Sequence, residues 1–406
     1  MALIQNIAPR QKPLKNLRNK FMLKIAVLFA HPVESDGLSI QGNLLYKGFK
    51  ELGEELGVEV MPCHYRPSFQ KEWVLDAWKP DLAIGIGSWS YSPDIVFSPQ
   101  RKGILPIPWF VANGWVANYH QELSRLPLTF TTSNWVTETF KRDGVDTSNY
   151  KMLPIGYDPA EIKPWAKDST EIKRLRSMLG VQEHEKMILT VGGDVTSKGA
   201  QEMFKALAEI NKDFKDWKYV CKHSDSDCAD DHRHEEEELI EQLGLDKGRI
   251  VYLTGMYSHD FMSQLLSAAD IYAAPSRLEG FGMIQMEAQV CGTPVISINV
   301  GGPVDTIIHG ETGFLAEVGE TVELKEEWAY EHMGFDADHK IVFDKPKVFA
   351  YRASIADLAK YTHQLLTDDA LRLKMGQAGI AHTAKNFHYH QIARQARQLI
   401  KEKLGK

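Results

Sequence analysis

The stretch Pro275-Ser-Arg-Leu-Glu-Gly-Phe-Gly-Met-Ile-Gln-Met-Glu287 follows the apolar run Asp270–Ala274 and opens a helical pattern. Its glycines, Gly280 and Gly282, let the backbone approach a ligand closely. A helix that begins there directs its free N–H groups and the positive end of its dipole toward that ligand, which favours an anion or sugar oxygens. A strand, a glycine-containing loop and a helix in this order are typical of an α/β fold with a doubly wound parallel sheet.

Outward from this stretch, the alternation of strand and helix covers most of the chain. The expected strands are 24–30, 58–61, 81–86, 108–112 and 128–131 in a first series, and 187–191, 218–221, 250–253, 270–274 and 294–299 in a second. The proline-rich segment Leu153–Trp165 between them suits a linker. We therefore expect two Rossmann-like domains, residues 1–160 and 161–385, that face each other across a cleft. Segment 317–354 fits the alternation poorly and is interpreted as an insertion of unknown role.

The composition is that of an ordinary globular protein. Of the 406 residues, 43% are hydrophobic and 25% charged, and the net charge of -7 argues against a nucleic-acid binder. No apolar run reaches the length of a membrane span. Four cysteines without CxxC spacing argue against a disulfide framework and indicate a reducing, cytoplasmic setting. Residues 1–20 hold basic but no acidic side chains, which predicts a disordered leader, or alternatively a weak peripheral contact with an anionic membrane.

Three side chains in the second series are candidates for ligand binding. Lys198, in the loop Val191-Gly-Gly-Asp-Val-Thr-Ser-Lys-Gly199, is placed where its ammonium group can reach a diphosphate. Glu279 and Glu287 lie at different depths along one wall of the expected cleft, where each can accept hydrogen bonds from hydroxyls of a long ligand. Taken singly, each of the three is better explained as a solvated or ion-paired surface side chain, and only the combined pattern favours ligand binding.

The acidic loop 223–234 raises the question of a metal ion. It contains Asp225-x-Asp227 and four further potential ligands, His223, Cys228, His232 and His234. An acidic loop contains Asp-x-Asp often by chance, so we expect a solvated loop without a metal, and a metal site is the alternative.

The combined pattern of the second series resembles the signature of family 4 retaining glycosyltransferases. The resemblance rests on Glu-Gly-Phe-Gly, on the spacing of Glu279 and Glu287, on Cys291-Gly-Thr-Pro-Val-Ile-Ser297 and on Gly301-Gly302. The matches are specific after about residue 128 and looser before it. The resemblance implies the glycosyltransferase B fold, a metal-independent enzyme without a cofactor, and a final helix, within 386–406, that packs back on the first domain.

The resemblance also implies roles for individual residues. Lys198 would contact the diphosphate of a nucleotide-diphospho-sugar, Glu279 the hydroxyls of the transferred sugar, and Glu287 the ribose. The other expected donor-binding residues are Gly192, Gly193, Met256, Gly280, Phe281, Gly282 and Met283, of which the last three would offer backbone N–H groups. An acceptor hydroxyl would enter from the first domain, past Gly37 and Asn113.

Two positions depart from the family pattern. Gly193 stands where the family has a second cation, an arginine, so that Arg277 or Lys222 would have to compensate, or the donor would bind less tightly. Asn113 stands where the family often has a histidine, and His120 is nearby but not aligned with it. Asn113 can still hydrogen-bond a sugar hydroxyl, but it cannot share a proton.

The expected function is transfer of a hexosyl unit, with retention of configuration, from a nucleotide sugar to a sugar, lipid-linked or protein-linked acceptor, in glycan or glycoconjugate synthesis. A sugar phosphorylase or nucleotide-sugar epimerase with a similar cleft is one alternative. A non-catalytic partner subunit that binds a nucleotide sugar is the other.

Overall fold

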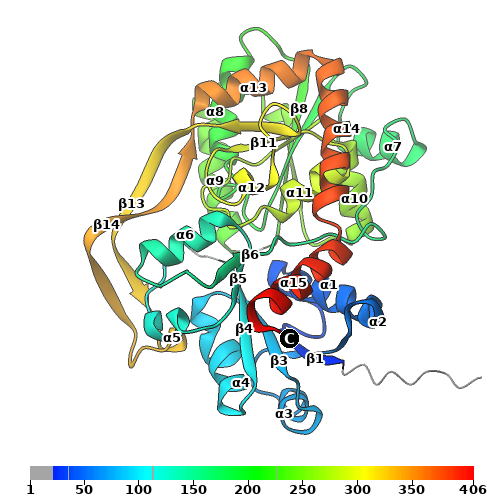
Figure 1. Ribbon diagram of the computed structural model, residues 1–406. Helices are drawn as coiled ribbons and strands as arrows, with labels where there is room; N and C mark the ends of the chain where they lie inside the picture. The colour runs from blue at the N-terminus through cyan, green and yellow to red at the C-terminus, as the bar shows by residue number, and fades with distance from the viewer. Residues whose placement is uncertain (1–21, 35, 112–113, 226) are drawn as a thin grey trace, which may run out of the picture.

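The computed structural model describes residues 22–406, apart from 35, 112–113 and 226 and the side chains of 226–231. The expected leader, residues 1–20, and Asn113 lie outside the described residues. The described chain forms two Rossmann-like α/β domains, one above the other in Figure 1, and this confirms the fold expected from the sequence.

The first domain is built on six parallel strands in the order β2-β1-β3-β4-β5-β6. The strands are β1 Leu23–Phe29, β2 Val58–His64, β3 Leu82–Gly87, β4 Leu105–Phe110, β5 Thr129–Thr131 and β6 Tyr150–Met152. Its helices are α1 Gly37–Glu51, α2 Gly53–Leu56, α3 Phe69–Trp73, α4 Ser98–Arg101, α5 His120–Ser124 and α6 Asn134–Arg142. Strand β4 begins three residues earlier than the expected strand 108–112, because Pro106 and Pro108 are accommodated inside it.

The second domain repeats this plan with the order β12-β11-β10-β7-β8-β9. The strands are β7 Lys186–Val191, β8 Trp217–His223, β9 Ile250–Thr254, β10 Ile271–Ala273, β11 Val295–Ile298 and β12 Gly313–Ala316. The helices are α7 Thr170–Met178, α8 Ala200–Ile210, α9 Asp227–Gln242, α10 His259–Ala268, α11 Met283–Val290, α12 Pro303–Thr306, α13 Ile355–Thr367 and α14 Asp369–Asn386. The short edge strands β6 and β12 were not expected, since three or four residues carry too little periodicity to stand out.

The last helix, α15 Tyr389–Leu404, returns to the first domain and packs against α1. Its buried side chains, Ile392, Ala393, Ala396 and Ile400, recur at helical spacing and provide the apolar face. Polar contacts reinforce the packing: Arg394 pairs with Glu55 at 2.7 Å, and Glu51 accepts hydrogen bonds from Tyr389 and His390. The chain therefore crosses between the domains twice, once through the linker Leu153–Trp165 and once before α15.

The segment expected to be an insertion is a long antiparallel ribbon, β13 Val318–Ala329 and β14 His339–Ala353, which we call the arm. The arm leaves the second domain and runs along the side of the first, over α6 and α5 (Figure 1). Phe343 and Phe349 of the arm pack against Trp115 of the first domain, with ring centroids 5.5 and 6.1 Å apart. Lys347 forms an ion pair of 2.8 Å with the buried Asp143. The arm thus joins the two domains.

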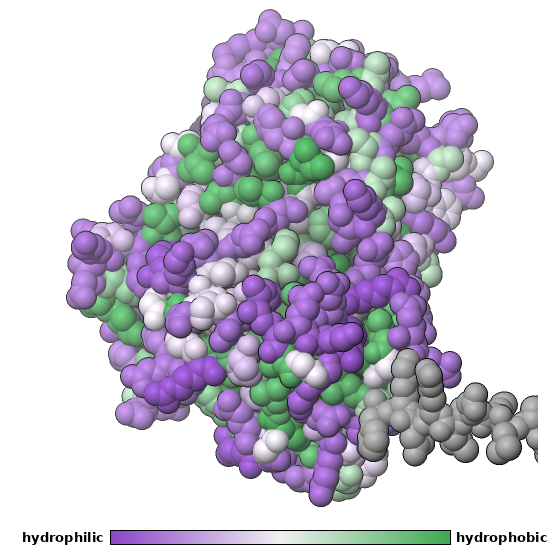
Figure 2. All heavy atoms as spheres, viewed as in Figure 1, coloured by the Kyte–Doolittle hydropathy of each residue, from purple (hydrophilic) through white to green (hydrophobic). Residues whose placement is uncertain are grey.

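The outer surface is largely hydrophilic on the face seen in Figure 2, with smaller apolar areas between. Within the described part of the chain, no helix combines the length and apolar character needed to cross a bilayer.

Candidate active site

The two strongest sequence candidates lie side by side at the point where the strand order of the second sheet reverses. Strand β7 is flanked by β8 on one side and by β10 on the other. Lys198 follows β7 and Glu279 follows β10, so both side chains extend from carboxyl ends at this switch point. Ligands of doubly wound sheets bind at such points, because the loops there diverge and leave a crevice.

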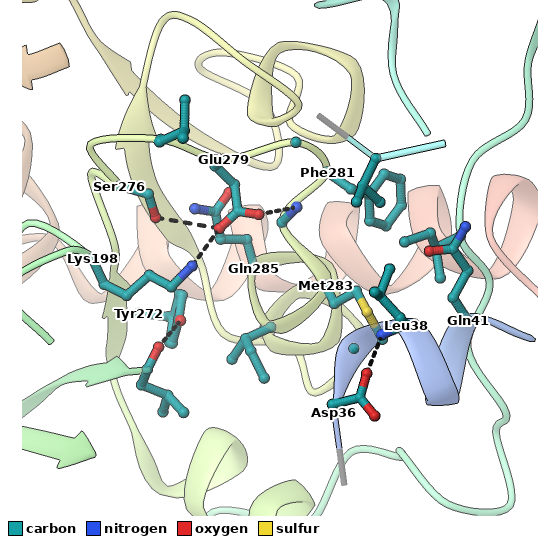
Figure 3. Close-up of a pocket in the computed structure, with 18 residues that line it drawn as sticks. Asp36, Leu38, Gln41, Lys198, Tyr272, Ser276, Glu279, Phe281, Met283 and Gln285 are labelled. Atoms are coloured by element: carbon teal, nitrogen blue, oxygen red, sulfur yellow. Dashed lines mark hydrogen bonds and ion pairs between the residues drawn. The ribbon is translucent and has the colours of Figure 1, made fainter. Parts of the chain in front are cut away.

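Lys198 and Glu279 form an ion pair, with 2.8 Å between Nζ and Oε2 (Figure 3). The other carboxylate oxygen, Oε1, accepts a hydrogen bond of 3.1 Å from the backbone N–H of Gly282. Burial acts to raise the pKa of Glu279, but the ammonium group of Lys198 and the backbone N–H groups of Phe281 and Gly282 outweigh it and hold the pKa below its usual value. The negative charge of Glu279 in turn raises the pKa of Lys198. Both groups are therefore charged, and each fixes the position of the other.

Helix α11 begins directly beside this pair. Gly282, its N-cap, has φ of 93°, a left-handed conformation in which a side chain would be strained. The N–H groups of Met283 and Ile284 belong to the first helical turn and have no partner within the helix. The sequence prediction needs a correction, because the N–H groups of Phe281 and Gly282 bind Glu279 and are not free for a sugar. The helix start offers its next amides and its dipole instead.

Two connected chambers meet at this helix start, and both are lined by Gly37, Val191, Lys198, Met283 and Ile284. The first has a volume of about 370 Å³, and we call it the sugar chamber after the part of the ligand that the sequence leads us to expect there. Its other lining residues are Asp36, Leu38, Gln41, Val111, Ile155, Tyr272, Ser276, Leu278, Glu279, Gly280, Phe281, Gly282 and Gln285. The second, the nucleotide chamber, has about 420 Å³, and its other lining residues are Ile40, Ile162, Gly192, Gly193, Lys222, Ser224, Met256, Tyr257, His259, Met262 and Glu287.

The expected donor-binding residues all line one of the two chambers, and Glu287 and Met256 share the nucleotide chamber. Burial, with a smaller contribution from the charge of Glu161, raises the pKa of Glu287 to about 8. The two glutamates of the signature therefore differ: Glu279 is ionised beside Lys198, whereas Glu287 holds its proton at neutral pH in the protein without a ligand.

The structure distinguishes the two cations considered as replacements for the family arginine. The guanidinium group of Arg277 is bound to Glu202 at 3.1 Å and to Gln201 at 2.9 Å, and Arg277 lines neither chamber. Lys222 lines the nucleotide chamber with Lys198, and burial lowers its pKa. Among the described residues no carboxylate lies within ion-pair distance of Lys222, so its charge is available to an anionic ligand.

The first domain contributes the opposite wall through the start of α1. Asp36 caps this helix, since its Oδ1 accepts hydrogen bonds from the N–H groups of Leu38 and Ser39. A Cβ atom on Gly37 would lie 3.5 Å from the sulfur of Met283, so the helix starts of the two domains face each other closely. Val111, the last described residue before Asn113, lines the sugar chamber. His120, the other acceptor-side candidate, lies at the start of α5 near the arm and lines neither chamber.

Sequence reasoning missed two amide side chains of the sugar chamber. Gln41 on α1 and Gln285 on α11 are buried, and both line it. The spacing of four residues between Gly37 and Gln41 places both on one helix face, and this is the signal that could have identified Gln41.

The acidic loop 223–234 is the candidate for a metal site, and the structure describes some of its side chains. A hydrogen bond of 3.1 Å joins Nε2 of His223 to the hydroxyl oxygen of Thr254. Nδ1 of His232 lies 3.0 Å from Oδ2 of Asp194. Where side chains are described, no three His, Cys, Asp or Glu residues come together as ligands. The side chains of Asp227 and Cys228 are outside the described ones, so the expected absence of a metal stays a prediction.

The segment that holds Lys198, Glu279 and Glu287 also carries a family match. Residues 171–329 match the family of glycosyl transferases group 1. The group 1 match begins at α7 and ends within the arm, and thus includes both chamber walls formed by the second domain.

Whole-chain comparisons extend the similarity to both domains. D-inositol 3-phosphate glycosyltransferase of Corynebacterium efficiens is 29% identical over 396 residues, which cover 94% of this chain and 81% of that protein. Among solved structures, Anabaena HepE in complex with UDP-glucose superposes with a TM-score of 0.67 at 19% identity, covering 93% of this chain and 99% of the other. Sucrose-phosphate synthase from Thermosynechococcus elongatus gives 0.67 at 18% identity, covering 93% and 98%. These structures share the glycosyltransferase B fold.

Proposed function

We propose that the protein is a retaining glycosyltransferase that moves a hexosyl unit from a nucleotide-diphospho-sugar to an acceptor hydroxyl, in glycan or glycoconjugate synthesis. One observation carries the proposal: the Lys198–Glu279 pair and the start of α11 lie where the sugar and nucleotide chambers meet. A diphosphate at this junction would face two cations, Lys198 and Lys222, and the positive end of a helix dipole. The base and ribose would occupy one chamber and the sugar the other.

In the proposed reaction the bond between the sugar carbon C1 and the diphosphate oxygen breaks, while a bond forms between C1 and the acceptor oxygen. The diphosphate gains negative charge as it leaves, and Lys198, Lys222 and the first amides of α11 stabilise that charge, so the mechanism uses no metal ion. The carboxylates that line the sugar chamber are both engaged, Asp36 in capping α1 and Glu279 with Lys198. The departing phosphate oxygen therefore takes the acceptor proton.

The donor proposed first is a uridine diphosphate sugar, because HepE, a structure with the same fold, holds UDP-glucose. The acceptor proposed first is a polyol or sugar phosphate, by analogy with the name of the Corynebacterium protein. We also propose a cytoplasmic location, where nucleotide sugars are available as donors.

The first experiment is a thermal-shift screen against UDP, GDP, ADP, CDP and dTDP. Binding to the native state alone stabilises by RT ln(1 + [L]/Kd), so we expect UDP to raise the melting temperature most. The variant Lys222→Met should weaken UDP binding by about tenfold, as loss of a charge-assisted contact does. Lys218→Met, at the other end of β8, is the matched control, because Lys218 binds the carbonyl of Gly248 outside the cleft. Equal affinity of the two variants would contradict the placement of the diphosphate.

The second experiment measures turnover. Lys198→Met should lower kcat far more than it weakens nucleotide binding, because the ammonium group acts mainly on the charge that develops in the transition state. Equal losses of kcat and of nucleotide affinity would count against a role of Lys198 in stabilising the transition state. Product analysis separates the alternatives: glycosyl phosphate made from free phosphate would indicate a phosphorylase, an isomerised nucleotide sugar an epimerase, and binding without any turnover a partner subunit.

A further inference from the structure

Two residues that line the sugar chamber carry buried amide groups without hydrogen-bond partners. Both polar atoms of the Gln41 amide, Oε1 and Nε2, are shielded from solvent and unpartnered, and its side chain is 0% exposed. Gln285 donates from Nε2 to the carbonyl of Ala274 at 2.9 Å, but its Oε1 is unpartnered. Buried polar atoms without partners are rare in folded proteins, because they lose hydrogen bonds to water without replacement.

The two amides come from opposite walls of the chamber. Gln41 extends from α1 of the first domain, and Gln285 from the first turn of α11 in the second, beside the Lys198–Glu279 pair (Figure 3). Exchanging the oxygen and nitrogen of the Gln41 amide still leaves one unpartnered donor and one unpartnered acceptor, so both assignments offer a sugar the same hydrogen bonds. Gln289, a turn further along α11, also has an unpartnered Oε1 but lines neither chamber.

We propose that Gln41 and Gln285 hydrogen-bond hydroxyl groups of the transferred sugar from both sides of the cleft, and so select a neutral hexosyl unit. The inference rests on the proposed function and specifies its substrate class. The amide oxygens of both residues need donors, and the O–H groups of a sugar supply them. A uronosyl unit replaces one hydroxymethyl group by a carboxylate, which donates nothing and is repelled by Glu279.

The role of Gln41 also links sugar recognition to the position of the domains. Its helix belongs to the first domain, whereas Lys198, Glu279 and Gln285 belong to the second. A sugar whose hydroxyls reach both Gln41 and Gln285 therefore bridges the cleft. A sugar that lacks a hydroxyl at either amide leaves buried amide atoms unpaired, and a site of this kind strongly disfavours a substrate without the matching hydroxyl.

The test compares binding of a nucleoside diphosphate, its glucosyl ester and its glucuronosyl ester by calorimetry, with the base chosen by the screen above and UDP as the first choice. Wild-type protein should bind the glucosyl ester more tightly than the diphosphate, and the glucuronosyl ester no more tightly. In Gln41→Met and Gln285→Met, affinity for the diphosphate should stay within about twofold of the wild-type value. The gain from the glucosyl group, which is the ratio of the affinity for the glucosyl ester to that for the diphosphate, should fall by about three- to tenfold. Gln289→Met is the matched control and should retain the full gain.

A second readout separates recognition from a structural role. Gln41→Met removes an unpartnered buried amide, so we expect an unchanged or higher melting temperature of the unliganded protein. An unchanged gain from the glucosyl group in Gln41→Met and Gln285→Met would overturn the inference, and so would parallel losses of diphosphate binding and melting temperature. A wild-type protein that binds no nucleotide sugar would instead overturn the proposed function, and the inference with it.

Discussion

At the scale of single residues, the two acids of the signature occupy different electrostatic environments. Glu279 has a cation within hydrogen-bond distance, whereas burial and Glu161 keep Glu287 protonated until the pH approaches about 8. A ribose hydroxyl donates its hydrogen bond best to a carboxylate. Nucleotide binding should therefore favour the ionised form of Glu287.

This difference predicts a pH dependence of nucleotide affinity. If only ionised Glu287 binds, UDP should bind about 30-fold more weakly at pH 6.5 than above pH 8, since the ionised fraction falls tenfold for each unit below the pKa. Calorimetric titration of UDP between pH 6 and 9 measures the effect, and Glu287→Gln should abolish it. If the affinity of the wild type for UDP instead falls as the pH rises from 6 to 9, the protonated acid is the binding form.

The same shift affects folding with the opposite sign. Native Glu287 retains a proton that the unfolded chain releases near pH 4.5, so the unliganded protein should lose stability as the pH rises from there toward 8. A bound nucleotide that favours the carboxylate would reduce this loss.

At the scale of elements, the loop between β7 and α8 decides how much positive charge reaches the diphosphate. Its two glycines differ in the space around them. A Cβ atom on Gly192 would lie 2.7 Å from Cγ of Lys198 and 2.8 Å from the carbonyl oxygen of Asp194, so a side chain cannot fit there. At Gly193 only Oγ of Ser224 lies near, at 3.6 Å, and the residue lines the nucleotide chamber. The loop therefore has room for the arginine that it lacks.

Gly193→Arg should tighten binding of UDP by about tenfold, because it adds a charge-assisted contact to the diphosphate without backbone strain. The control Gly193→Met adds similar bulk without charge and should leave the affinity unchanged or lower it. Calorimetry at two salt concentrations measures both, and the gain of the arginine variant should shrink at higher salt. Equal affinity of the two variants would show that position 193 does not face the diphosphate.

At the scale of the whole molecule, the domains are joined on two sides. The linker and α15 form the covalent crossing, and the arm forms a non-covalent one along α5 and α6 (Figure 1). The two domains also make direct contacts. Thr132 donates a hydrogen bond of 3.2 Å to the carbonyl of Gly280, and Asn134 binds the carboxylate of Asp305 through its backbone and side-chain N–H groups. The loop of Glu279 is therefore held by the first domain as well as by its own.

The arm is anchored by Asp143, whose buried carboxylate binds Lys347 of the arm, Arg142 and the N–H of Val116. Lys347→Met should cost about 1–2 kcal/mol of stability, less than the loss of a whole buried pair, because Arg142 remains. Hydrogen exchange of residues 114–119 should become faster, whereas UDP affinity should change little. Lys345→Met is the matched control, since Lys345 is an exposed residue of the same strand. Unchanged exchange in the Lys347 variant would show that the arm is held by its aromatic contacts alone.

The sequence by itself determined two Rossmann-like domains and the loops that carry Lys198, Glu279 and Glu287. Apolar runs, glycine positions and helical spacing are local properties, and parallel sheets bring the loops after their strands to one edge. Only the tertiary structure decided that Lys198 pairs with Glu279 across 81 residues of chain, that Lys222 rather than Arg277 faces the nucleotide chamber, and that the arm docks on the first domain. The unpartnered amide of Gln41 is likewise a feature that only the tertiary structure decided. Such features depend on which side chains the packing of distant segments brings together, and no local pattern encodes that choice.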